Sequence, residues 1–104
     1  MRPASARDVF FHDCDDETAH WAAGCLRFQG PKPLSEASPI ERWPDAPRHV
    51  ILTRDDRAVR LDWAREEARK WLGGREPVLL AGSHSPFLSR PAALADALVD
   101  CLSP

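Results

Sequence analysis

Residues 77–91 read PVLLAGSHSPFLSRP, and this stretch decides the fold class. The apolar run 77–81 stops at Gly82, as a short buried strand does at its end. Pro91 precedes a stretch rich in alanine and leucine, which is typical of the first turn of a helix. His84 is therefore expected in a loop at the carboxyl end of a strand, where α/β proteins usually place their chemistry.

The preceding segment repeats this pattern of a strand followed by a helix. Residues 48–53, RHVILT, predict another buried strand. Residues 61–72 predict a helix with apolar and charged side chains on opposite faces, and glycines at 73–74 end it. A last helix is expected over about 90–102. Residues 48–104 thus form two βα units of an α/β fold with parallel strands, and because a two-stranded sheet is small, we expect further strands beside it.

The amino-terminal part has a different character. Two aspartates at 15–16 begin a helix that we expect over about 16–28. Prolines are concentrated in the next segment, so 29–47 is expected to be an extended connector without regular structure. We expect a single partial domain over 1–104, in which 9–47 hold this helix and the connector.

Composition excludes several classes of function. Basic and acidic residues number 14 and 16 and are mixed along the chain, so no nucleic-acid partner is expected. The absence of a long apolar run argues against a membrane partner or a secretory signal, which favours the cytoplasm. Cys14, Cys25 and Cys101 form no disulfide pattern. The HDC triplet at 12–14, with His20 and Cys25 nearby, offers metal-ligand side chains but matches no zinc spacing, so neither a metal nor another cofactor is expected.

Polar side chains follow both predicted strands. Asp55 and Asp56 come after the first strand and His84 after the second, 28 residues beyond Asp56. An Asp that holds one ring nitrogen of a His leaves the other nitrogen free to act as a base. Asp56 is the preferred partner of His84, with Asp55 as the alternative. Ser83 and Ser85 are interpreted as hydrogen-bonding loop residues rather than nucleophiles.

Three stretches carry a resemblance to a known family: FFHDCDDETAHWAAGCLRFQGPKPL at 10–34, HVILTRDDRAVRLDW at 49–63 and EPVLLAGSHSPFLSRPAALADAL at 76–98. Together they resemble the carboxyl-terminal part of the α/β-hydrolase family over roughly residues 9–102. They are most similar to its bacterial esterase-like members, which are similar to plant methylesterases and hydroxynitrile lyases. The resemblance implies a partial α/β-hydrolase fold in which the amino-terminal helix belongs to a cap over the substrate pocket.

The resemblance also implies roles for individual residues. Asp56, directly before RAV, matches the acid of the family's catalytic triad, and His84 in GSHSPF matches its histidine. The Gly-x-Ser-x-Gly motif of the nucleophile is absent, because no Ser in the chain has a Gly two residues before it. The implied activity is hydrolysis of a small-molecule ester, once the missing nucleophile-bearing half completes the site. The chain alone is expected to be inactive.

Two alternatives remain at the level of sequence. The chain could be a non-catalytic binding or assembly module that pairs with another chain through its sheet edge and apolar faces. It could also be an inactive remnant of a hydrolase. In each case, a two-stranded sheet cannot cover the apolar faces of its helices, so self-association is expected.

Overall fold

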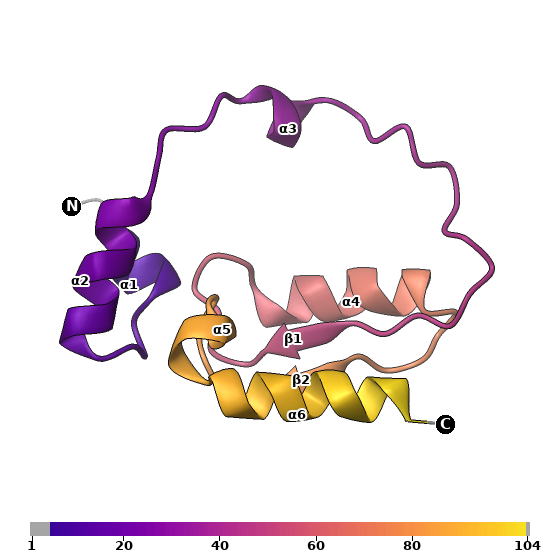
Figure 1. Ribbon diagram of the computed structural model, residues 1–104. Helices are drawn as coiled ribbons and strands as arrows, with labels where there is room; N and C mark the ends of the chain where they lie inside the picture. The colour runs from indigo at the N-terminus through magenta and orange to yellow at the C-terminus, as the bar shows by residue number, and fades with distance from the viewer. Residues whose placement is uncertain (1–4, 104) are drawn as a thin grey trace.

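The computed structural model describes residues 5–103, and its centre is a small sheet between two helices (Figure 1). The sheet consists of β1 (Ile51–Thr53) and β2 (Val78–Leu80). Helix α4 (Leu61–Trp71) connects the two strands and lies on one side of them, while α6 (Pro91–Leu102) lies on the other. This is the predicted order of strand, helix, strand and helix.

The two strands are parallel, as predicted. Ile51 pairs with Val78 and Thr53 with Leu80. Regular pairing covers only three residues of each strand, so both are shorter than the predicted 48–53 and 77–81. The expectation of fully buried strands is wrong: Val78 is 37% exposed. The reason is that each strand of a two-stranded sheet has only one neighbour, which leaves its other edge open.

Helix α4 follows its predicted bounds to within one residue. Its core-facing positions include Ala68 and, just after the helix, Leu72, both of which are buried. Gly73 and Gly74 have φ of 66° and 86°, in the left-handed region that glycine adopts without strain. The predicted glycine stop is confirmed.

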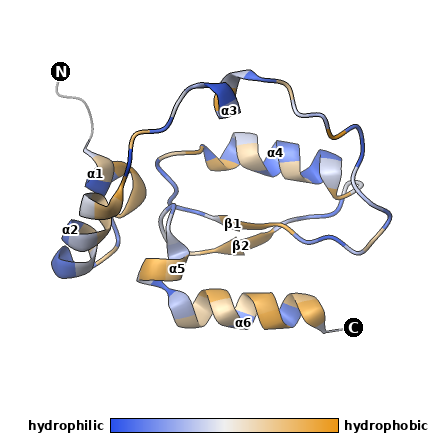
Figure 2. Ribbon diagram, turned by 45° about the horizontal axis from the view of Figure 1, so that its top comes forward, coloured by the Kyte–Doolittle hydropathy of each residue, from blue (hydrophilic) through white to orange (hydrophobic). Residues whose placement is uncertain are grey.

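Helix α6 begins at Pro91 as predicted, but the loop before it contains an unpredicted short helix, α5 (Pro86–Ser89). Pro86 fixes the first turn of α5, and the Arg90 amide closes it by donating to the Pro86 carbonyl at 2.8 Å. Only Ala97 of α6 is buried, and much of this helix is apolar (Figure 2). No helix within residues 5–103 is long and apolar enough to cross a membrane.

Two helices form the amino-terminal end of the molecule. Helix α1 (Ala6–Phe10) was not predicted, and the Ser5 side chain caps it. Helix α2 (Asp16–Cys25) is capped by Asp15, whose carboxylate accepts a hydrogen bond from the Thr18 amide at 2.7 Å, as the aspartate pair predicted. It ends before the predicted residue 28 because Leu26 is already extended. Its buried residues, Ala19 and Ala22, pack with Phe11.

A long connector leads from α2 back to β1 and arches away from the sheet (Figure 1). Every residue of 29–47 is exposed, and α3 (Lys32–Ser35) is its one short helix, a small departure from the expected extended chain. Arg48 connects the end of this segment to the end of α4: its side chain donates to the carbonyls of Trp71 and Pro44, both at 3.0 Å.

Candidate active site

Asp56 lies in the loop directly after β1, where the backbone fixes its side chain. One carboxylate oxygen, Oδ1, accepts hydrogen bonds from the amides of Ala58 at 2.8 Å and Val59 at 2.9 Å. The side chain is only 14% exposed. Burial raises the pKa of Asp56, but the hydrogen bonds from Val59, His84 and Ala58 outweigh it and hold the pKa below its usual range. The residue is thus an oriented carboxylate.

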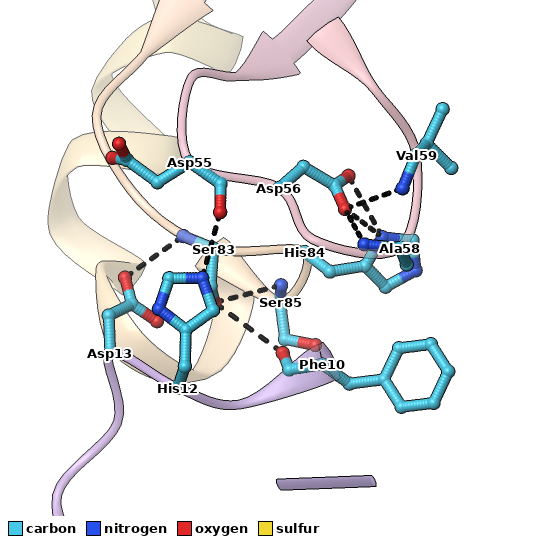
Figure 3. Close-up of polar contacts among 10 residues, drawn as sticks. All are labelled: Phe10, His12, Asp13, Asp55, Asp56, Ala58, Val59, Ser83, His84 and Ser85. Atoms are coloured by element: carbon cyan, nitrogen blue, oxygen red, sulfur yellow. Dashed lines mark hydrogen bonds and ion pairs between the residues drawn. The ribbon is translucent and has the colours of Figure 1, made fainter. Parts of the chain in front are cut away.

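His84 lies in the loop after β2 and faces Asp56 (Figure 3). Its Nδ1 is 2.9 Å from Oδ2 and 3.1 Å from Oδ1 of Asp56. Because an ionised carboxylate only accepts, Nδ1 carries a hydrogen, and in the neutral form of the ring Nε2 then has a lone pair. The predicted contact between these two side chains is confirmed.

The histidine is also open to its surroundings. Its side chain is 38% exposed and borders a hollow of about 170 Å³ that is lined further by Thr53, Pro86 and Leu94. The Phe10 ring packs against the imidazole in a tilted arrangement, with a centroid distance of 5.3 Å. The imidazole is therefore held on one side and accessible on another, an arrangement suited to exchanging a proton with a bound molecule.

Asp55, the alternative partner of His84, has a different role. Its Oδ2 accepts a hydrogen bond from the Gly82 amide at 3.0 Å, and its own amide donates to the Gly82 carbonyl at 3.0 Å. Asp55 therefore joins the two loops, while Asp56 alone faces the imidazole.

The loop that carries His84 is closely packed. Gly82 has φ of 134°, and a Cβ there would lie 3.1 Å from Arg90 Cδ and 3.2 Å from Asp13 Oδ2. Ser83 and Ser85 are buried, and the Ser85 amide donates to Ser83 Oγ at 3.3 Å. Ser83 is thus a hydrogen-bonding loop residue through its hydroxyl, as interpreted, whereas Ser85 takes part through its backbone amide and carbonyl.

Sequence reasoning missed the contribution of the segment between α1 and α2. The Asp13 carboxylate accepts from the Ser83 amide at 3.0 Å, and His12 Nε2 donates to the Asp55 carbonyl at 2.8 Å. The only signal in the sequence is the polar HDC triplet at 12–14, whose side chains also fit metal ligands and therefore do not point to this contact. Within residues 5–103, no three His, Cys, Asp or Glu side chains are grouped closely enough to hold a metal ion.

Helices on both sides of parallel strands, with polar residues at the carboxyl ends of those strands, define an α/β protein. A sequence model of the alpha/beta hydrolase family matches residues 1–97, so the chain belongs to this family. Its short two-stranded parallel sheet is consistent with part of the α/β fold.

Among curated proteins, the chain is similar to a pyrethroid hydrolase from Sphingobium wenxiniae. The two are 30% identical over 95 residues, which make up 90% of this chain and 34% of the relative. The chain thus spans about a third of the length of the curated relative that it matches. No solved structure matches the chain significantly.

Proposed function

We propose that this chain supplies the histidine and the aspartate of a serine-type hydrolase that acts on small-molecule esters. The observation that carries the proposal is the hydrogen bond between His84 Nδ1 and the Asp56 carboxylate beside an accessible hollow. Membership of the alpha/beta hydrolase family and the similarity to a protein named pyrethroid hydrolase support hydrolysis as the reaction. The esterase-like subtype follows from the resemblance of the sequence.

The proposed mechanism uses both nitrogens of His84. As a serine Oγ bonds to the ester carbonyl carbon, its proton passes to His84 Nε2, and the same proton then goes to the departing alcohol. Water, deprotonated by the same nitrogen, then bonds to the acyl carbon; as the bond to the serine oxygen breaks, Nε2 returns the proton to Oγ and the acid is released. Asp56 holds the Nδ1–H tautomer and stabilises the imidazolium.

The nucleophile and the oxyanion-binding groups are proposed to come from polypeptide outside these 104 residues. No Ser of the chain has a Gly two residues before it, so the Gly-x-Ser-x-Gly motif is not found in the sequence. The chain would then form a catalytic site only together with a nucleophile-bearing segment, which lies either upstream in the same polypeptide or on another chain.

The test is to join the chain to the amino-terminal part of the pyrethroid hydrolase, or to its own upstream coding sequence, and to measure hydrolysis of a nitrophenyl acetate. We expect turnover from the joined protein and none of this type from the chain alone. His84→Ala should lower kcat/KM of the joined protein by about 10⁴-fold or more, because the proton acceptor is lost. His49→Ala, an exposed histidine ahead of β1 and at the opposite end of this strand from Asp56, is the matched control and should leave the rate unchanged.

The two aspartates give a graded outcome in the same assay. Asp56→Asn should lose somewhat less activity than His84→Ala, because an amide can still contact the ring but favours the wrong tautomer. Asp55→Asn should be nearly silent, since the amide oxygen can still accept from the Gly82 amide. Hydrolysis by the isolated chain that His84→Ala leaves unchanged would overturn the proposal.

The second candidate function is a non-catalytic module that assembles with another chain, or an inactive remnant of a hydrolase. Exposed apolar side chains on α6, among them Leu98, Val99 and Leu102, favour a partner surface. Turnover that depends on His84 in the joined protein would exclude both alternatives. A correctly folded joined protein without turnover would favour them.

The remaining assignments follow from the same proposal. The mechanism uses no metal or organic cofactor, and its partner is a small molecule rather than nucleic acid or membrane. We propose the cytoplasm as its compartment, because an odd number of cysteines without a disulfide spacing fits a reducing environment.

A further inference from the structure

The segment between α1 and α2 contacts both loops that carry the Asp56–His84 pair. We call residues 10–13 the clamp segment. On the side of the aspartate loop, His12 Nε2 donates to the Asp55 carbonyl at 2.8 Å. On the side of the histidine loop, the Phe10 carbonyl accepts from Ser83 Oγ at 3.4 Å, and the Phe10 ring lies against the imidazole. These contacts bring together residues about 43 to 73 positions apart in the sequence (Figure 3).

Within the clamp segment, Asp13 makes the contact nearest to His84 in the sequence, because it binds the amide of the preceding residue. Its Oδ2 accepts from the Ser83 amide, directly before His84, at 3.0 Å and lies 3.7 Å from Arg90 Nε. The side chain is only 18% exposed. Burial raises the pKa of Asp13, but hydrogen bonds from Ser83 outweigh this and lower the pKa overall, so the group is a carboxylate at neutral pH.

The backbone around this contact leaves little room for another arrangement. A Cβ at position 82 would lie 3.2 Å from Asp13 Oδ2, so the carboxylate would have to move by a few tenths of an ångström, and the φ of 134° itself favours glycine. The two amides before His84 both donate to carboxylates: that of Gly82 to Asp55 and that of Ser83 to Asp13. The direction in which the imidazole leaves the loop is therefore set from two separate segments.

We propose that Asp13 is a positioning residue for His84: by holding the Ser83 amide, it fixes the loop that directs Nδ1 of the imidazole at Asp56. The claim that this positioning assists catalysis rests on the proposed function. The claim that Asp13 holds the contact between His84 and Asp56 does not depend on it. The two claims are therefore tested by different measurements.

The first measurement is the tautomer of His84 in the 104-residue chain, from ¹⁵N chemical shifts of the histidine rings above the pH at which they are protonated. Solution or solid-state NMR serves equally, so association of the chain is no obstacle, and His84→Ala assigns the signal. The wild-type chain should show mainly the Nδ1–H tautomer, because the contact with Asp56 selects it. In Asp13→Leu the ratio of Nδ1–H to Nε2–H should fall by about three- to tenfold, the scale of the net contribution of one typical hydrogen bond.

Two kinds of variant separate positioning from general stability. Asp13→Asn retains a carbonyl oxygen for the Ser83 amide, so it should restore most of the wild-type ratio. Asp15→Ala removes the cap of α2 without touching the histidine loop, and Glu17→Gln removes an exposed charge on the same helix. Both should leave the ratio unchanged. A wild-type ratio in Asp13→Leu, or an equal change in Asp15→Ala, would overturn the proposal.

The second measurement is steady-state kinetics in the joined protein. Asp13→Leu should lower kcat by about 10- to 100-fold while KM changes little, because a misdirected base impairs the reaction more than substrate binding. If the joined protein proves inactive while the tautomer still depends on Asp13, the proposed function fails and the positioning role stands. If kcat falls without a change in tautomer, the positioning role is wrong.

Discussion

Asp55 and Asp56 are neighbours in the loop after β1, yet their carboxylates bind different partners. The Asp56 carboxylate is held by the amides of Ala58 and Val59 and faces His84. The Asp55 carboxylate turns to the Gly82 amide instead. Both residues lie in the loop after β1, and because the Asp55 carboxylate is bound to the Gly82 amide, only that of Asp56 faces the imidazole. The second still serves the same site by tying its loops together.

The lowered pKa of Asp56 predicts how its contribution to stability depends on pH. The folded state favours the ionised form, so this contribution is fully present above the unfolded pKa of about 3.9 and is lost as pH falls through the lower pKa of the folded state. We expect the free energies of unfolding of wild type and Asp56→Asn to converge as pH falls below about 4. Urea unfolding at several pH values below 5 measures this. Asp45→Asn, an exposed carboxylate, is the control for loss of one charge, and a constant difference between wild type and Asp56→Asn would contradict the prediction.

At the scale of elements, alanine should have opposite effects on stability at a glycine after α4 and at a glycine within α2. Gly74 has φ of 86° and open space around it, so Gly74→Ala should destabilise the protein through backbone strain alone, by about 1 kcal/mol. Gly24 lies within α2, also in open space, so Gly24→Ala should stabilise it by about 0.5 kcal/mol. Urea unfolding followed by tryptophan fluorescence measures both. Equal effects of the same sign would contradict the role of the left-handed turn.

The elements that the sequence predicted well are those with local signals. Apolar spacing and the glycine stop identify α4, and Pro91 identifies the start of α6. The contact between Asp56 and His84 was predictable because the carboxyl ends of parallel strands meet at one edge. The clamp segment was not, since Asp13 and Ser83 are 70 residues apart and no periodic pattern connects them. Helices α1 and α5 are too short for periodicity to indicate them.

At the scale of the whole molecule, the chain exposes more surface than its size requires. Its accessible area is 8388 Å², whereas a compact monomer of 11.6 kDa exposes about 5,800 Å². Its radius of gyration is 15.6 Å, against about 13 Å for a compact domain of this length. The arching connector accounts for part of the excess, and the open sheet edges and the outer face of α6 add to it. Additional polypeptide would cover such surface in the proposed complete hydrolase.

The isolated chain should therefore associate with itself. Val99 and Leu102 on α6 are 61% and 85% exposed, and burying such side chains is favourable whatever the partner. We expect sedimentation velocity to show species larger than a monomer as the concentration rises through the micromolar range. Adding salt should not dissociate them, because salt screens charges rather than apolar contacts.

Lysine substitutions locate this association on the molecule. Val99→Lys combined with Leu102→Lys should shift the equilibrium toward monomer, since the charges would have to be buried on contact. Ala92→Lys with Ala95→Lys adds the same charge at exposed positions of the same helix but removes little apolar surface, so it should have a smaller effect. A wild-type chain that stays monomeric and unfolds cooperatively would show that its exposed apolar surface needs no cover. That result would remove the main physical support for a proposed second segment.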